Sequence, residues 1–308
     1  MPYEEDTPRP MKENLLNLET IHECNCCLGN KTLNPLVSVI DLSQACLEQC
    51  ILKFDFYTVI MLEGEVEDFL YGRKYYDYSN ASLLFLTPGE SLKVDYSELF
   101  YKKGWLLAFH PELLLFTPLM EQIKNYRFFS YAPDEALHLS LREKQKVTDC
   151  LHGIEDELEH ATDCHSQGLI TKYIELLLDY CTRFYERQFI TRCEANKALI
   201  RQTNVLLDEY IQSGRLKTKG MPSEGYCAGQ LQLSTQYFID LLYFETGQNI
   251  YEYFEFKRLE AAKEMLLEEG ATPASVAQRL GYRDTLQFSR LFGKVVGIRP
   301  CDYRIAQN

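Results

Sequence analysis

The sequence of 308 residues lacks several features that would each identify a class of protein. No apolar run approaches the roughly 20 residues that span a bilayer, so we expect no membrane helix. No GxxxxGKS, GxxxxGKT, GxGxxG or GxSxG segment occurs, so nucleotide hydrolysis and esterase chemistry have no motif to support them. The first residues, MPYEEDTPRPMKENLLNLE, contain no apolar stretch typical of a signal peptide, and we therefore expect a cytoplasmic protein.

Regularly spaced cysteine pairs are also missing. The 11 cysteines follow no framework spacing, which favours reduced thiols over disulfides. Cys24, Cys26 and Cys27 lie beside His22 and form the one cluster that suits a soft metal such as zinc. No second pair of ligands follows at a finger-length spacing, so we predict small buried side chains there, no metal and no cofactor.

Positive charge is scarce in the first part of the chain only. The whole chain carries a net charge of −13 at pH 7. Residues 1–195 hold 18 Lys and Arg against 32 Asp and Glu, whereas residues 196–308 hold 14 against 13. The acidity therefore belongs to residues 1–195, and this asymmetry indicates two parts with separate roles.

Short apolar runs broken by turn residues are present after a mixed N-terminal arm of residues 1–34. The runs PLVSVIDL, FDFYTVIMLEG, ASLLFLTPGE and GWLLAFHPE combine β-branched and aromatic residues with Gly or Pro at their ends. Strands at this spacing are typical of a β-sandwich or a β-barrel. We therefore predict a β domain over residues 35–136.

After Pro133 the apolar periodicity changes to about 3.6 residues. The segments LREKQKVTDCLHGIEDELEH and LITKYIELLLDYCTRFYERQF predict a helical hairpin within residues 137–195. The second segment carries an apolar stripe, formed by Ile170, Tyr173, Leu177, Tyr180 and Phe184. This stripe either packs on the β domain or forms a dimer interface.

Residues 196–308 contain an internal repeat with an offset of 50 residues. The segment STQYFIDLLYFETG from Ser234 aligns with DTLQFSRLFGKVVG from Asp284, including Gly247 with Gly297. A short helix is predicted before each segment, so the repeat indicates two helix-turn-helix units. Between them, NIYEYFEFKRLEAAKEMLLEE predicts a helix about 30 Å long, close to the roughly 34 Å of one turn of duplex DNA.

The segment ASVAQRLGYRDTLQFSRLFGKVVGIRPCDYR closely resembles the second helix-turn-helix of AraC/XylS-type transcription regulators. LQLSTQYFIDLLYFETGQNIYEYFEFKRLEAAKEML resembles the first unit and the linker helix, so the resemblance covers about residues 200–305. FDFYTVIMLEGEV, ASLLFLTPGE and LLAFHPELL resemble the cupin-like sensor domain of that family. The resemblance implies a two-domain α+β protein, with a cupin-like β-barrel sensor, a helical dimerisation hairpin and an all-α DNA-binding domain in which a linker helix joins two helix-turn-helix units.

The resemblance also implies which residues contact DNA. The second recognition helix presents Thr285, Gln287 and Arg290 to the bases, and the guanidinium of Arg290 suits guanine O6 and N7. Candidates for phosphate contact are Arg283, Ser289, Lys294 and Arg299. Considered without the resemblance, this polar helix edge is more simply explained as a solvated face.

The first recognition helix departs from the family pattern. Asp240, Tyr243 and Phe244 stand where basic residues are usual, and an aspartate accepts from cytosine N4 but repels phosphate. Gln236 is the remaining candidate for base reading. We expect this unit to bind DNA weakly or to act mainly as a scaffold.

We therefore predict a sequence-specific transcription regulator that responds to a small molecule bound in the N-terminal domain. Side chains alternate between the two faces of a strand, and this alternation indicates Tyr57, Val59 and Met61 as candidate ligand-binding residues. Packing in the core explains the same pattern equally well. The expected partners are an operator duplex, a second copy of the chain, a small-molecule effector and RNA polymerase, and no membrane.

Two alternatives remain open. In the first, the barrel binds no ligand and serves only dimer or partner contacts. In the second, a cupin enzyme is fused to a DNA-binding module, which would need several histidines gathered on barrel strands around a metal. Only His110 lies in the strand-rich region, so we predict that the chain is not an enzyme.

Overall fold

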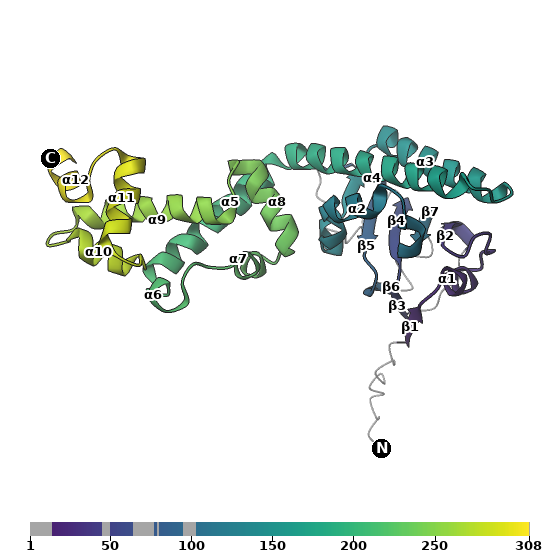
Figure 1. Ribbon diagram of the computed structural model, residues 1–308, viewed down its shortest axis with the longest axis horizontal. Coiled ribbons are helices and arrows are strands. Elements are labelled where there is room, and N and C mark those ends of the chain that lie inside the picture. Colours follow the sequence, from purple (N-terminus) through teal and green to yellow (C-terminus); the bar gives the residue numbers. More distant parts are fainter. Residues whose placement is uncertain (1–13, 45–49, 64–76, 79, 95–102, 308) are drawn as a thin grey trace, which may run out of the picture. The chain divides into compact units, whose positions relative to one another are not determined.

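The computed structural model describes residues 14–44, 50–63, 77–78, 80–94 and 103–307 (Figure 1). Residues 1–13 of the predicted arm and the end of the predicted FDFYTVIMLEGEV strand lie outside the described residues. The chain divides into two compact units, residues 1–191 and 192–308. None of the described helices is both long and apolar enough to span a bilayer.

The first unit contains two β-sheets (Figure 1). The three-stranded sheet has the order β1-β3-β6, formed by β1 (Asn14–Leu18), β3 (Cys50–Phe54) and β6 (Glu90–Val94). The antiparallel five-stranded sheet has the order β2-β7-β4-β5-β8, formed by β2 (Val37–Asp41), β7 (Gly104–Phe109), β4 (Tyr57–Glu63), β5 (Ala81–Leu86) and β8 (Leu137–Leu139).

Both faces of the five-stranded sheet are buried, because successive side chains of a strand point to opposite faces. In β4, Ile60 and Leu62 pack into a core with the three-stranded sheet and helix α1 (Ile21–Leu28). Val59 and Met61 pack into a second core on the other face, with helices α3 (Leu141–Glu159) and α4 (Ser166–Thr191). The sheet is therefore covered by a sheet on one side and by helices on the other.

The described strands do not close into the predicted barrel, since the two sheets share no hydrogen-bonded strand pair. Side chains instead form hydrogen bonds with backbone groups of the outer strands. At the edge strand β8, Gln188 accepts a hydrogen bond from the backbone N–H of His138 at 2.8 Å, and Arg187 donates to the His138 carbonyl at 2.7 Å. Asn30 likewise donates to the carbonyl of Val39 in β2 at 3.2 Å. These backbone groups are paired with side chains, whereas barrel closure requires pairing with another strand.

The predicted hairpin is formed by α3 and α4. Ser140 caps α3, and the side chain of Glu143 returns to the Ser140 backbone N–H at 2.9 Å. A further short helical segment, η1 (Leu42–Gln44), follows β2. Five others connect β7 to β8, namely η2 (Pro111–Leu114), α2 (Leu119–Gln122), η3 (Ile123–Asn125), η4 (Arg127–Ser130) and η5 (Pro133–Glu135).

The predicted apolar stripe on α4 divides between two environments. Ile170, Leu177 and Phe184 are buried in the core beneath the five-stranded sheet of the same unit. Tyr180 packs against the margin of this core, whereas Tyr173 is 36% exposed and its ring lies against Gly153 of α3. The buried part of the stripe therefore packs inside its own unit, and this part is not available to a dimer interface.

The second unit is all-helical. Its helices are α5 (Cys193–Gln212), α6 (Leu216–Lys219), α7 (Glu224–Gln230), α8 (Thr235–Thr246), α9 (Ile250–Leu267), α10 (Pro273–Arg279), α11 (Thr285–Val296) and α12 (Pro300–Gln307). The two predicted helix-turn-helix units are α7 with α8 and α10 with α11, and α9 is the linker helix. The boundary expected at residue 196 falls inside α5.

The repeat is visible in the ends of the two longer helices. Ser234 caps α8 and Asp284 caps α11, each accepting a hydrogen bond from the backbone N–H three residues later. Both helices end at a glycine in the left-handed region, with φ of 69° at Gly247 and 81° at Gly297. The two helices thus have the same length and equivalent ends.

Candidate DNA-binding site

Helix α11 buries one face and exposes the other. Phe288 and Phe292 are fully buried in the core of the second unit. The opposite face carries exposed side chains from Thr285, Leu286, Gln287, Arg290 and Lys294. The helix therefore presents a polar, cationic edge to the surroundings while its aromatic side chains anchor it.

A groove of about 360 Å³ runs along this exposed face. It is lined by Asp284, Leu286, Gln287, Arg290, Leu291 and Lys294. Neither Arg290 nor Lys294 forms an ion pair with any residue that the structure describes. Both cations are therefore available to an external anion, and the structure brings the predicted residues Gln287, Arg290 and Lys294 onto one surface.

The other predicted contacts surround this face. Arg283 is exposed in the turn before α11, and Thr285 is exposed in the first helical turn. Ser289 is half-buried. Arg299 lies beyond the end of the helix, and its Nε is 2.8 Å from a carboxylate oxygen of Asp302. A phosphate would compete with this exposed ion pair, so Arg299 is the least available of the predicted cations.

The residues that orient α11 were not predicted as functional. Arg258 of the linker helix is buried, and its guanidinium lies over the ring of Tyr282 in the turn before α11. The ring of Tyr282 contacts that of Phe288 at a centroid distance of 5.1 Å. Arg258 follows Ile250 and Phe254 on the apolar side of the linker helix, and a cation on an apolar stripe was the available sequence signal.

The exposed face of α8 differs chemically from that of α11. Asp240 and Phe244 occupy the positions that correspond to Arg290 and Lys294 at the offset of 50 residues. Gln236 Nε2 lies 3.3 Å from both carboxylate oxygens of Asp240, so the predicted base reader is engaged with a neighbour on its own helix. The structure therefore gives α8 no cation on its exposed face comparable to those of α11.

The predicted ligand-binding residues lie in the core between the sheet and the helices. Val59 and Met61 are buried there, and the ring of Tyr57 stacks on Phe109 at 5.2 Å and contacts Phe129 edge-on at 5.3 Å. Aromatic packing therefore already occupies this face of the strand.

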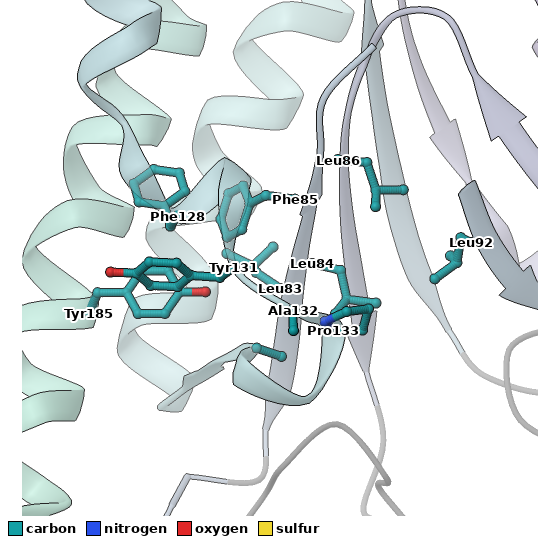
Figure 2. Close-up of a pocket in the computed structure, with 11 residues that line it drawn as sticks. Leu83, Leu84, Phe85, Leu86, Leu92, Phe128, Tyr131, Ala132, Pro133 and Tyr185 are labelled. Carbon is teal, nitrogen blue, oxygen red and sulfur yellow. The ribbon is translucent and has the colours of Figure 1, made fainter. Parts of the chain in front are cut away.

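A small cavity lies elsewhere in the first unit, at one end of β5 (Figure 2). The rings of Phe85, Phe128, Tyr131 and Tyr185 gather on one side of it. Its volume is about 10 Å³, enough for about one water molecule, and none of the three predicted ligand-binding residues lines it.

The cysteine cluster beside His22 is partly buried. Cys24 points into the core, and burial raises the pKa of its thiol to about 12. Cys26 is exposed, with its sulfur 3.5 Å from Nε2 of His22. Within the described ranges, no three His, Cys, Asp or Glu side chains are grouped as metal ligands.

Residues 227–306, from α7 to α12, match the family model described as a helix-turn-helix domain. The MmsAB operon regulatory protein of Pseudomonas aeruginosa is 36% identical over 72 residues, which cover 23% of this chain and 24% of that protein. The chain therefore matches only about a quarter of that relative. The HTH-type transcriptional activator RhaR of Mannheimia succiniciproducens is 23% identical over 263 residues, 82% of this chain and 86% of that protein.

Two solved structures are also similar. ToxT of Vibrio cholerae is 11% identical, covering 87% of this chain and 97% of that chain, with a TM-score of 0.31. The C-terminal domain of AraT from Geobacillus stearothermophilus is 26% identical, covering 35% of this chain and 84% of that chain, with a TM-score of 0.29.

Proposed function

We propose that helix α11 carries most of the operator recognition in this chain, which belongs to the AraC/XylS family of DNA-binding transcription regulators. The observation that supports this is the exposed face of α11, where Gln287, Arg290 and Lys294 line one groove. The cations on this face have no acidic partner among the described residues. A duplex supplies both the phosphates and the base edges that such a face can bind.

Each residue on this surface has a distinct proposed role. Arg290 reads a guanine through two parallel hydrogen bonds, and Gln287 reads an adenine through its amide. Thr285 contacts a base edge through its hydroxyl. Lys294, Arg283, Ser289 and Arg299 contact phosphates or sugars and fix the position of the helix. Base contacts then determine specificity, while the cations provide most of the affinity.

The first helix-turn-helix contributes less to DNA binding in this proposal. Asp240 occupies the position equivalent to Arg290, and it is repelled by phosphates. Gln236 would have to release Asp240 before it could read a base. Helices α7 and α8 therefore act mainly to support α9.

For residues 1–191 we propose a cupin-like sensor that transmits the binding of a small molecule. The two facing sheets provide the framework. A second candidate role is dimer or partner contact without a ligand. The packing of the Tyr57 ring on Phe109 and Phe129 favours this second role, because it fills the face of β4 on which the ligand-binding residues were predicted. A screen of metabolites for a rise in the unfolding temperature of the chain distinguishes the two roles.

We further propose that the chain is a cytoplasmic homodimer with no catalytic role. The outer face of α4 carries Leu169 and Leu176, which are 42% and 43% exposed. These side chains have helical spacing and are not needed by the core, so a second copy can cover them. RNA polymerase is a further proposed partner, since transcription regulators act on its recruitment.

The experiment that tests the DNA-binding proposal compares substitutions in the two recognition helices. A duplex selected from random sequences by the wild-type chain serves as the common target, at one salt concentration. Arg290→Ala should cost about 1–3 kcal/mol of binding free energy and relax specificity at one base pair. Asp240→Ala should cost nothing, and Asp240→Arg should leave binding unharmed or strengthen it. Equal losses from Arg290→Ala and Asp240→Ala would show that both units read DNA alike and would refute the proposal.

A further inference from the structure

Leu286 places an apolar side chain on the exposed, cationic face of α11. It lies in the first turn of the helix and is 59% exposed. Among the described residues, the core of the second unit takes Phe288 and Phe292 from this helix, with Leu291 packed against it, and Leu286 is not part of it. Packing within the protein therefore does not explain why this position is a leucine.

Leu286 shares a surface with the residues that are proposed to bind DNA. It lines the groove of about 360 Å³ together with Gln287, Arg290 and Lys294. Leu286, Arg290 and Lys294 follow one another at intervals of four residues, so they form one ridge along the helix. A duplex that is held by Arg290 and Lys294 therefore also faces Leu286.

The chemistry of leucine limits what it can recognise on a duplex. Its side chain has no hydrogen-bond donor or acceptor, so it gains nothing from a phosphate or from the polar edge of a base. The apolar group in the major groove is the C5-methyl of thymine, which apolar side chains contact. Water leaves both surfaces when they meet, and this stabilises the contact. Leu286 also lies near the N-terminal end of α11, the part of a recognition helix that contacts base edges.

We propose that Leu286 reads a thymine of the operator through its methyl group. This assignment deepens the proposed base-reading role of α11 and rests on it. Four residues of an α-helix advance by about 6 Å, which is close to two base-pair steps of about 3.4 Å each. The thymine therefore lies about two base pairs from the guanine that Arg290 reads.

Removal of the methyl group from the DNA tests this contact. The duplex selected from random sequences by the wild-type chain is prepared with each thymine in turn replaced by deoxyuridine, which forms the same base pair and lacks only that methyl. The full-length chain should bind about fourfold more weakly when the thymine facing Leu286 is replaced, the factor that corresponds to one buried methyl group. This position should lie about two base pairs from the one at which Arg290→Ala relaxes specificity.

Two exposed aliphatic side chains of α11 provide matched variants. Leu286→Ala should bind the unmodified duplex more weakly than wild type, and deoxyuridine at the sensitive position should cause it no further loss. Val295→Ala is the control, because Val295 is 58% exposed on the same helix and is not among the residues that line the groove. This variant should keep the fourfold loss that wild type shows. Both variants should unfold at the wild-type temperature, since neither side chain is buried.

The results separate this inference from the proposed function. If deoxyuridine has the same effect at every position in wild type and in Leu286→Ala, the thymine contact is refuted, even when Arg290→Ala loses affinity and specificity. The same result is expected if Leu286 contacts a partner protein and not DNA. By contrast, unchanged DNA affinity in Arg290→Ala would refute the proposed reading of guanine, whereas a deoxyuridine effect that depends on Leu286 would still show the thymine contact.

Discussion

The guanidinium of Arg258 lies 3.6 Å from the centroid of the Tyr282 ring, in the interior of the second unit. Glu255 contacts both residues, with its carboxylate 3.2 Å from Nη1 of Arg258 and 3.4 Å from the Tyr282 hydroxyl. Arg258 and Glu255 belong to the linker helix, whereas Tyr282 belongs to the turn before α11. This contact therefore couples the linker to the orientation of the proposed recognition helix.

Replacement of Arg258 tests this coupling. Arg258→Met should lower the free energy of unfolding by about 2–3 kcal/mol, because it removes a desolvated cation–π contact and leaves Glu255 without its cation. DNA affinity should fall as well. The control is Lys263→Met, whose exposed pair with Glu260 should contribute less than about 1 kcal/mol. Urea unfolding measures both variants, and equal losses would show that the buried contact has no special role.

The stability of the second unit should depend on pH through Tyr282. Burial raises the pKa of Tyr282 from 10.0 to about 12. The folded state therefore keeps the phenol proton more strongly than the unfolded state does. This contribution is complete below about pH 10 and is lost as the pH rises to about 12, on the order of 2 kcal/mol. Tyr282→Phe should lose less stability over this interval than wild type, as urea unfolding at several pH values would show. Identical pH profiles would contradict this prediction.

Gly281 should be more sensitive to substitution than Gly297, although both have positive φ. A Cβ at Gly281 would lie 2.9 Å from the carbonyl oxygen of Leu216 in α6, whereas nothing lies within 4 Å at Gly297. Gly297→Ala should cost about 1–2 kcal/mol for the left-handed backbone alone. Gly281→Ala should cost more, because the backbone of α6 must also move. Thermal unfolding compares them, and equal shifts in the midpoint would argue against a tight contact with α6.

The proposed dimer can be separated from the core by two sets of substitutions on α4. Glutamate at both Leu169 and Leu176 should give folded monomers, because these side chains are exposed on the outer face. Leu177→Ala should instead lower the free energy of unfolding by about 2–5 kcal/mol, because Leu177 is fully buried. Sedimentation velocity and circular dichroism distinguish these effects. An unchanged mass for the double glutamate variant would place the interface elsewhere.

The sequence determined the local features of the second unit. The repeat and the linker helix follow from the spacing of apolar residues. The ends of helices α10 and α11 follow from capping residues and a terminal glycine, namely Thr272, Pro273, Asp284 and Gly297. All of these signals act over a few residues. The exposed positions of Gln287 and Arg290 also follow from helical periodicity, because Phe288 and Phe292 define the buried side. Whether these exposed residues contact DNA remains a prediction.

Only the tertiary structure decided which surfaces meet. Periodicity predicted that Leu177 lies on an apolar face, but the five-stranded sheet of the same unit covers that face. Strand patterns were compatible with a closed barrel, but Gln188 and Arg187 occupy the backbone groups at the edge of β8. Arg258 is buried because Tyr282, 24 positions later in the sequence, supplies its aromatic partner. Local patterns specify which side of an element is apolar, whereas the partner on that side depends on contacts between residues far apart in the sequence.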